Sequence, residues 1–483
     1  MKQKQNKKLI LWLLALAQFL VILDSVIVNV ALPAIKTSLG FDATTLQWVV
    51  TAYVLTFGGF LMLGGRAADL FGRRRVLVGS IIVFSIMSLL IGLSQSSTMF
   101  IVLRSLQGLA AAFMSPAALS ILLTTFKEGN ERNKALSLWG ALGAGGAAVG
   151  VMLGGLITQT LGWEWNFFIN VPLGFLAAWG LYKIIPAHSK EESDKKLDIS
   201  GALLVTSGLV TLVYALTQAE VWGWADAATW SLFGLSAAFL VAFFFNESKV
   251  KHPLMPLSIF QLRNVMGGNV AMMPIMAGAF GMFFFASLYI QNVLQYSPIL
   301  TGLSFIPVPI IIGVISTNAP RLLQRFSLKQ LMITGTILLA LGNFYLSLIP
   351  LNGDYFINVL PGLLIMAVGM GLSFVSVTIA ATSGVPARES GLASGMINTS
   401  QQVGGALGLA ILSSIAAAVT ASHQAAGNAF REASLYGYKQ VFLWAGIFIV
   451  FGLLAIVFIV RTKKQQHESA KTPETAPEPV ALH

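Results

Sequence analysis

The sequence contains no cysteine, which excludes a disulfide framework, a thiol nucleophile and a cysteine-built metal site. The five histidines form no ligand-like pair, and no H-E-x-x-H stretch occurs. There is also no G-x-x-x-x-G-K-[ST] phosphate loop, which argues against direct use of ATP. We therefore expect no metal, no cofactor, no catalytic residues and no enzymatic activity.

Charged residues are scarce as well. They make up 10% of the chain, whereas 56% of residues are hydrophobic and the mean hydropathy is +0.77. Soluble proteins carry about 25% charged residues. Apolar runs of ~18–25 residues match the length of helix that crosses a bilayer, and the short alternating segments of a β-barrel are absent. The predicted fold class is an all-α polytopic membrane protein, which has the lipid bilayer as its surroundings.

Fourteen apolar stretches are long enough to be membrane spans. An even number of spans puts both termini on the same side of the membrane. We predict spans at residues 9–32, 45–65, 75–94, 98–125, 134–160, 164–185, 199–219, 229–246, 262–291, 298–320, 328–349, 356–384, 391–419 and 437–460.

The distribution of basic residues gives the orientation of these spans. Of the 30 lysines and arginines, 26 fall on the side of the N-terminus, Lys36, Arg431 and Lys439 fall on the other side, and Arg104 lies within the fourth span. Because basic loops stay in the cytoplasm, both termini are predicted to be cytoplasmic. The same asymmetry accounts for the net charge of +11, so we expect no nucleic-acid partner.

The spans group as six, two and six. We predict an N-terminal six-helix bundle at 1–185, linkers with two inserted helices at 186–261, a C-terminal six-helix bundle at 262–461, and a disordered cytoplasmic tail at 462–483. The short basic loop GRAADLFGRRR after the second span is weakly repeated after the tenth as APRLLQRFSLK. Repeated bundles with a binding site at the midplane between them are the plan of a transporter.

Asp24 lies well inside the first apolar run, Leu9 to Pro33. An acid at the centre of a spanning helix costs about 2.5–3.5 kcal/mol on insertion scales, so its side chain must face a partner or a polar cavity. One hypothesis is a static buried ion pair or a protonated, hydrogen-bonded carboxyl. The other, which is the default for an intramembrane acid, is a proton or cation site.

Arg104 lies early in the fourth span, among Ile101, Val102, Leu103 and Leu106. Its guanidinium either extends to the nearby membrane interface or acts as a positive group that tunes proton uptake near Asp24. We take Asp24 and Arg104 as the candidate proton-coupling pair.

Two glycine-containing motifs follow. The loop between the second and third spans contains Gly65, Asp69, Gly72, Arg73 and Arg75, where glycines permit a tight reversal and Asp69 precedes a helix N-terminus. The fifth span carries Gly146, Gly150, Gly154 and Gly155, a smooth stripe against which another backbone can pack closely.

These stretches resemble a known family. The loop motif resembles the signature loop of the major facilitator superfamily. Five further stretches resemble motifs of its fourteen-span drug:proton antiporter branch. They are LDSVIVNVALP from Leu23, LRSLQG from Leu103, the glycine stripe of the fifth span, NVPLG from Asn170 and GLASGMINT from Gly391. The resemblance implies two six-helix bundles plus two inserted helices, a gating role for the loop, and a glycine interface between halves that opens and closes.

Polar and aromatic groups inside the spans are candidate substrate-binding residues, although helix packing explains each one singly. As a set, they fit an amphiphilic pocket because few are charged. They are Gln18, Asn29, Tyr53, Gln107, Met273, Phe284, Tyr289, Asn292, Asn398 and Gln402.

The resemblance implies a monomeric antiporter of the bacterial cytoplasmic membrane that exports amphiphilic small molecules or drugs in exchange for protons. A transporter of one endogenous neutral or anionic solute, such as a lipid, siderophore or metabolite, is the alternative, because the predicted C-terminal spans carry no acids. A membrane enzyme or receptor is disfavoured because Asp24 and Arg104 are the only charged residues that lie more than a few positions from a predicted span end.

Overall fold

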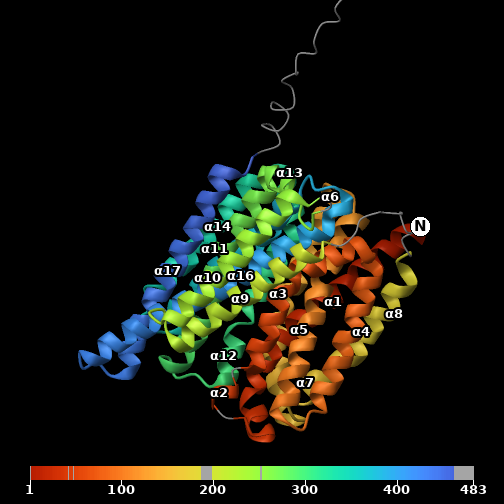
Figure 1. The fold of residues 1–483 in the computed structure, drawn as a ribbon. Helices are drawn as coiled ribbons and strands as arrows, with labels where there is room; N and C mark the ends of the chain where they lie inside the picture. Colours follow the sequence, from red (N-terminus) through yellow and green to blue (C-terminus); the bar gives the residue numbers. More distant parts are fainter. Residues whose placement is uncertain (1, 42, 47, 187–197, 251–252, 462–483) are drawn as a thin grey trace, which may run out of the picture.

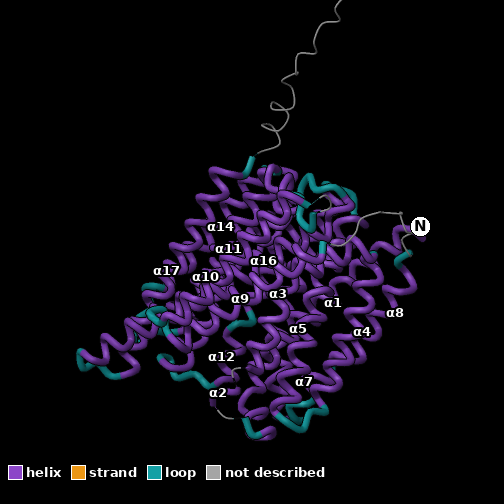
Figure 2. Tube along the Cα trace, viewed as in Figure 1, coloured by secondary structure: helices purple, strands orange, loops and turns teal. Residues whose placement is uncertain are grey.

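The structure is a computed structural model that describes residues 2–41, 43–46, 48–186, 198–250 and 253–461. Every regular element within these ranges is a helix (Figures 1 and 2). The all-α fold class is therefore confirmed. The predicted disordered tail and most of the first linker lie outside the described residues.

The N-terminal half consists of six long helical segments and two short ones. Helix α1 packs along α6, α3 along α5, and α4 against both α5 and α8. The elements are α1 (Lys2–Leu39), α2 (Ala43–Leu46), α3 (Trp48–Phe71), α4 (Arg73–Gly92), α5 (Ser97–Thr125), α6 (Asn130–Thr160), α7 (Trp165–Phe168) and α8 (Asn170–Ile184).

The C-terminal half repeats this plan. Helix α11 packs along α16 and α17, and α14 packs along α15 and α17. The elements are η1 (Leu257–Gln261), α11 (Arg263–Asn292), α12 (Pro298–Ser304), α13 (Pro307–Arg325), α14 (Leu328–Leu346), η2 (Tyr355–Val359), α15 (Leu360–Thr382), η3 (Ala387–Glu389), α16 (Ser390–Ala425) and α17 (Phe430–Ile459).

Two inserted helices, α9 (Ile199–Trp222) and α10 (Ala227–Lys249), form a hairpin between the halves. Helix α10 packs mainly on α9, while α9 lies against α3 and α16 (Figure 1). The hairpin therefore covers the junction where these two helices of opposite halves meet.

The halves contact each other mainly through two helix pairs, α3 with α16 and α6 with α13. The N-terminus and the end of α17 lie at the same end of the bundle, which is the end where α13 finishes and α6 begins (Figure 1). We call this the terminal end.

Two predicted single spans are each divided in the structure. Residues 298–320 correspond to α12 and α13, which separate at Phe305 and Ile306, and residues 164–185 correspond to α7 and α8. Pro307 is the first residue of α13, where its fixed φ and missing N–H suit a helix start but not a helix interior.

Twelve helical stretches among the described residues are long and apolar enough to cross a membrane. The two other predicted spans correspond to α6 and α14, helices of 31 and 19 residues that pack lengthwise within their bundles. The chain is thus multi-pass, and fourteen crossings remain the prediction.

Candidate functional site

Asp24 lies in the interior of the N-terminal half and is fully buried. Its Oδ2 accepts a hydrogen bond from Nη1 of Arg104 at 2.6 Å. Its Oδ1 accepts from Nε2 of Gln107 at 2.9 Å and from Nδ2 of Asn170 at 3.0 Å. Because all three contacts are donors, the side chain acts as a carboxylate acceptor.

Arg104 is also buried, with 1% of its side chain exposed, so it does not extend to the membrane interface. Its Nη1 also donates to Oε1 of Gln107 at 2.7 Å, and its Nε donates to the carbonyl of Val49 at 3.3 Å. The guanidinium carbon lies 4.4 Å from the ring centroid of Tyr53, a geometry that favours cation–π attraction. Helices α1, α3 and α5 thus hold the pair in one arrangement.

Asn170 and Ser88 complete the network, and the sequence-based list of site residues contains neither. Oγ of Ser88 accepts from Gln107 at 2.6 Å and from Asn170 at 3.2 Å. Asn170 begins α8, within the stretch NVPLG that carries part of the resemblance. Ser88 had no comparable signal, because a serine in an apolar helix is common and carries no charge.

The geometry in this conformation is that of a buried ion pair, the first of the two hypotheses for Asp24. Neither charged group has solvent contact sufficient for proton exchange, as 0% and 1% of the two side chains are exposed. In a buried ion pair, mutual attraction and hydrogen bonds offset the loss of hydration. Removing one partner lowers the free energy of unfolding by about 3–5 kcal/mol, because the other charge stays buried without compensation. In this conformation the pair is therefore closed to solvent.

Asp69 connects the two halves at the terminal end. Its Oδ1 accepts the N–H of Gly391 at 3.0 Å, and its Oδ2 accepts the N–H of Leu392 at 3.0 Å, both at the start of α16. A carboxylate at a helix N-terminus is stabilised by the free N–H groups and the helix dipole. Arg73 pairs with Asp69 at 2.9 Å and also donates to the carbonyl of Ala387.

The backbones of the two halves approach closely beside this contact. A Cβ atom on Gly65 would lie 2.3 Å from the carbonyl oxygen of Gly391, and the converse distance is also 2.3 Å. Gly72 has φ +94°, a conformation that favours glycine, and is the N-cap of α4. Arg75 is exposed on α4, and no contact of its side chain with the other half is found among the described residues. We call Gly65, Asp69, Arg73 and the start of α16 the latch.

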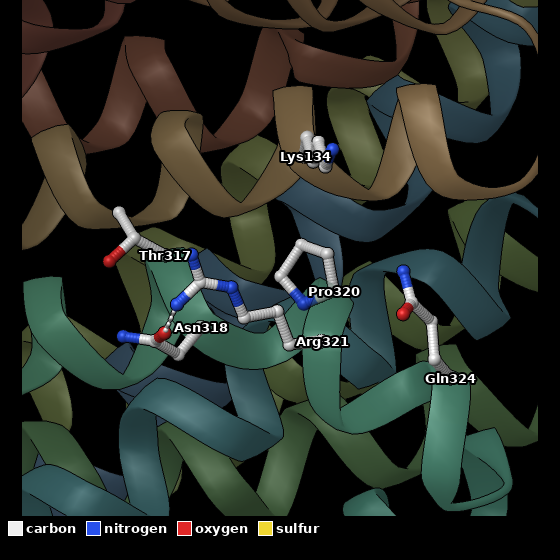
Figure 3. Close-up of a pocket in the computed structure, with 6 residues that line it drawn as sticks. All are labelled: Lys134, Thr317, Asn318, Pro320, Arg321 and Gln324. Atoms are coloured by element: carbon white, nitrogen blue, oxygen red, sulfur yellow. Dashed lines mark hydrogen bonds between the residues drawn. The ribbon is translucent and has the colours of Figure 1, made fainter.

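The second contact between halves, α6 with α13, contains a cavity instead. It has a volume of about 500 Å³ and lies at the terminal end, because its lining residues (Figure 3) belong to the start of α6 and the end of α13. Its lining residues are Lys134 of α6 and Thr317, Asn318, Pro320, Arg321 and Gln324 of α13.

Comparison with known proteins identifies the family. A model of the Major Facilitator Superfamily matches residues 14–409. The chain belongs to the major facilitator superfamily. It is 37% identical to the puromycin resistance protein pur8 of Streptomyces alboniger, over 96% of this chain and 93% of that protein. It is 35% identical to the cephamycin export protein CmcT of Amycolatopsis lactamdurans, over 90% and 88%.

Solved structures of facilitators have the same fold. The human organic anion transporter MFSD10 superposes with a TM-score of 0.68 at 14% identity, covering 93% of this chain and 99% of that one. The proton:xylose symporter XylE superposes with a TM-score of 0.62 at 15% identity, covering 93% and 96%. These likenesses show the fold. The family match and the relatives identify this member of the superfamily as a multi-pass membrane transporter of small molecules, not an enzyme.

The glycine stripe of this facilitator lies within one half. Cβ atoms added at Gly146, Gly150 and Gly154 would meet α1, at Phe19, Val26 and Ile27 respectively, with the shortest distance 2.8 Å at Gly154. Gly155 is half-buried. In this conformation the side of α6 that carries these three glycines faces its own bundle, and an interface between halves at the stripe stays a prediction. Packing, the simpler explanation of the spacing, accounts for them.

The candidate substrate-binding residues of the N-terminal half are mostly engaged in packing contacts. Oε1 of Gln18 accepts from Oγ of Ser115 at 3.0 Å. Tyr53 is buried and stacks on Phe57, and Gln107 belongs to the Asp24 network. The side chain of Asn29 lies outside the described residues.

The candidate substrate-binding residues of the C-terminal half do not converge on one point. Tyr289 donates to the carbonyl of Pro350 at 2.8 Å, and Asn292 donates to Oη of Tyr438 at 3.1 Å. Asn398 donates to the carbonyl of Ser394, one turn earlier in α16, at 2.9 Å. The remaining three are the partly buried Met273 and Gln402 and the 46% exposed Phe284.

Proposed function

We propose that this facilitator exports amphiphilic small molecules or drugs across the bacterial cytoplasmic membrane in exchange for protons. The names of its relatives, which include a resistance protein and an export protein, support drug efflux. The observation that carries proton coupling is the Asp24–Arg104 pair, whose nitrogen and oxygen lie 2.6 Å apart inside the spanning helices.

In the proposed cycle, a proton from outside reaches Asp24 once α1 and α5 separate enough to admit water. Neutralising the carboxylate removes its attraction to Arg104, and the transporter then favours the conformation open to the cytoplasm. There the proton leaves, assisted by the positive Arg104, and cargo binds. Alternating access works only if proton and cargo each bind the two conformations with different affinity. We therefore propose that cargo binds the midplane cavity when Asp24 is deprotonated, and that the proton binds when cargo has left.

The latch has a place in this cycle. We propose that Asp69 and Arg73 hold the cytoplasmic end closed, as in the described conformation, and release α16 when the transporter opens inward. Contacts that form in only one of two conformations bias the equilibrium between them. The glycines at positions 65 and 391 make the closed contact sterically possible, because any side chain there would meet backbone.

Proteoliposomes with an imposed pH gradient and a chemically varied panel of cargoes test this function. Asp24→Asn should abolish gradient-driven transport while the protein still incorporates into liposomes. Glu128→Gln is a matched control, because Glu128 is also an acid but its side chain is 64% exposed. Undiminished transport by Asp24→Asn would rule out coupling through this carboxylate.

The proposed orientation places both termini in the cytoplasm, with one chain per functional unit in the bilayer. Single cysteines introduced into the cysteine-free chain test it. An impermeant maleimide added to intact cells should label Lys36→Cys and leave Phe326→Cys unlabelled, because these positions lie at opposite ends of the bundle. The reverse pattern would contradict the orientation. Light scattering of the purified protein should give the mass of a monomer.

A single endogenous solute, neutral or anionic, is the second candidate cargo. The scarcity of acids in the C-terminal spans favours it over cationic drugs, since a desolvated cation needs a negative partner. A growth-protection panel of cationic dyes, biocides and antibiotics separates the two candidates. Failure of protection across the whole panel would favour the endogenous solute.

A further inference from the structure

The two contacts between halves are built from related loops. Residue Gly72 is the N-cap of α4, and Ser327 is the N-cap of α14. Aligning these two caps places Gln324 at the position of Asp69, three residues before the cap. The C-terminal repeat thus has a neutral amide where the N-terminal repeat has the carboxylate of the latch.

This exchange has a visible structural consequence. Asp69 bridges the two halves directly, because both of its carboxylate oxygens accept backbone N–H groups of α16. Gln324, in contrast, lines the open cavity of about 500 Å³ between α6 and α13. One water occupies about 30 Å³, so the cavity holds far more than a bridging water and lies within the usual size range of ligand sites.

The cavity is also positively charged. Lys134 of the N-terminal half and Arg321 of the C-terminal half both line it, on opposite helices (Figure 3), and the guanidinium of Arg321 is turned toward Asn318 of its own helix. Arg321 donates to Oδ1 of Asn318 at 3.0 Å. Among the residues that the structure describes, neither cation forms an ion pair. Both residues are solvent-exposed, so water screens part of their mutual repulsion, and an anion between them would remove the rest.

We propose that the phosphate of an anionic phospholipid of the inner leaflet binds in this cavity, between Lys134 and Arg321. The phosphate supplies the negative charge that Gln324 lacks, and it connects the two halves at the terminal end as Asp69 does on the other side. Arg and Lys are common phosphate ligands. The amide of Asn318 donates to the carbonyl of Val314 and has a second N–H that can donate to a phosphate oxygen. The choice of leaflet rests on the proposed orientation, whereas the binding site does not depend on proton coupling.

Lipid binding to the purified full-length protein tests the site directly. The delipidated protein in neutral detergent is titrated with phosphatidylglycerol, phosphatidylcholine or inorganic phosphate, and bound lipid is counted by native mass spectrometry. Phosphatidylglycerol should bind more tightly than phosphatidylcholine. Arg321→Gln and Lys134→Gln should each raise its Kd about fivefold, the weight of one basic residue at an anionic membrane surface.

Arg325→Gln is the matched control, because Arg325 is an exposed arginine on the last turn of α13 but does not line the cavity. Its Kd should stay within twofold of the wild type. Unchanged Kd values for both cavity variants, in protein that elutes normally from size exclusion, would overturn the site. Competition by inorganic phosphate, without preference for phosphatidylglycerol, would overturn the lipid source. Neither result depends on transport, so the lipid-binding proposal and the antiport proposal can be refuted independently.

Discussion

Asp69→Asn should open the terminal end of the transporter. Asparagine keeps one acceptor oxygen, so it loses one of the two hydrogen bonds to the N–H groups of α16, as well as the charge that pairs with Arg73. A hydrogen bond to a charged group contributes about 1.5–3 kcal/mol. The ratio of closed to open conformations should therefore fall roughly 10- to 150-fold.

Electron–electron distance measurements in nanodiscs can detect this shift. Spin labels at Glu128→Cys and Phe326→Cys report the separation of the halves at the terminal end, and the chain has no other cysteine to block. Both positions are exposed, and they lie in the α5–α6 and α13–α14 connections. The wild type should give mainly the short distance, and Asp69→Asn should gain a longer one.

The matched control is Arg75→Gln, which changes an exposed charge a few residues beyond Asp69 and should leave the distances unchanged. A distance distribution for Asp69→Asn that superposes on the wild type would refute the assignment of the latch. A shift of equal size in both variants would show that loop charge in general, rather than the contact with α16, controls closure.

Three further predictions follow from the same contacts. Gly65→Ala should favour the open conformation in the same distance assay, because its Cβ would meet the Gly391 carbonyl at 2.3 Å, whereas Gly79→Ala, with nothing within 4 Å, should not. Arg104→Met should destabilise the fold by about 3–5 kcal/mol because it leaves Asp24 buried without its partner; thermal unfolding measures this, and an unchanged Tm would contradict it, while the double variant with Asp24→Asn should recover part of the loss. Asp198 is the N-cap of α9, and its side chain accepts the N–H of Gly201. Burial favours a higher pKa for Asp198, but hydrogen bonds from Gly201, Ser200 and Asn246 outweigh it and lower the pKa below the usual value. The capping contribution of about 1 kcal/mol should be fully present above the unfolded-state pKa, near pH ~4, and should decrease as pH falls through the lowered pKa. The Tm gap between the wild type and Asp198→Ala should therefore narrow over that range, and a constant gap would contradict the prediction.

The sequence was most informative where a residue type conflicts with its surroundings. Asp24 and Arg104 stand out because charge is costly in an apolar helix, and the structure brings them together. Asn170 and Ser88 were missed because small neutral groups carry little cost and their partners are distant in sequence. The partners of Asp69 could not be predicted, since backbone N–H groups exist at every helix start and have no sequence signature.

Helix packing was also predictable only in part, because the sequence indicates a close contact but not the helix that makes it. The spacing of Gly146, Gly150 and Gly154 predicted a close helix contact, and one exists. The spacing could not identify α1 as the opposing helix, because it defines a smooth surface but not its partner. Likewise, the apolar run at 298–320 predicted a helical span, but its division near Pro307 depends on tertiary packing around α12 and α13.

The inserted hairpin is mechanically tied to the parts of the transporter that must move. Close contact between α9 and α3 is required at Gly59, where a Cβ would lie 2.3 Å from Val210, and Arg66 of α3 donates to the carbonyl of Pro253 beyond α10 at 3.0 Å. Because α9 also rests on α16, rocking of the two bundles must shear the hairpin against at least one of them. If the bundles rock as proposed, the inserted pair of helices adds resistance to each transport cycle, and deleting it should change the turnover rate before it changes cargo selection.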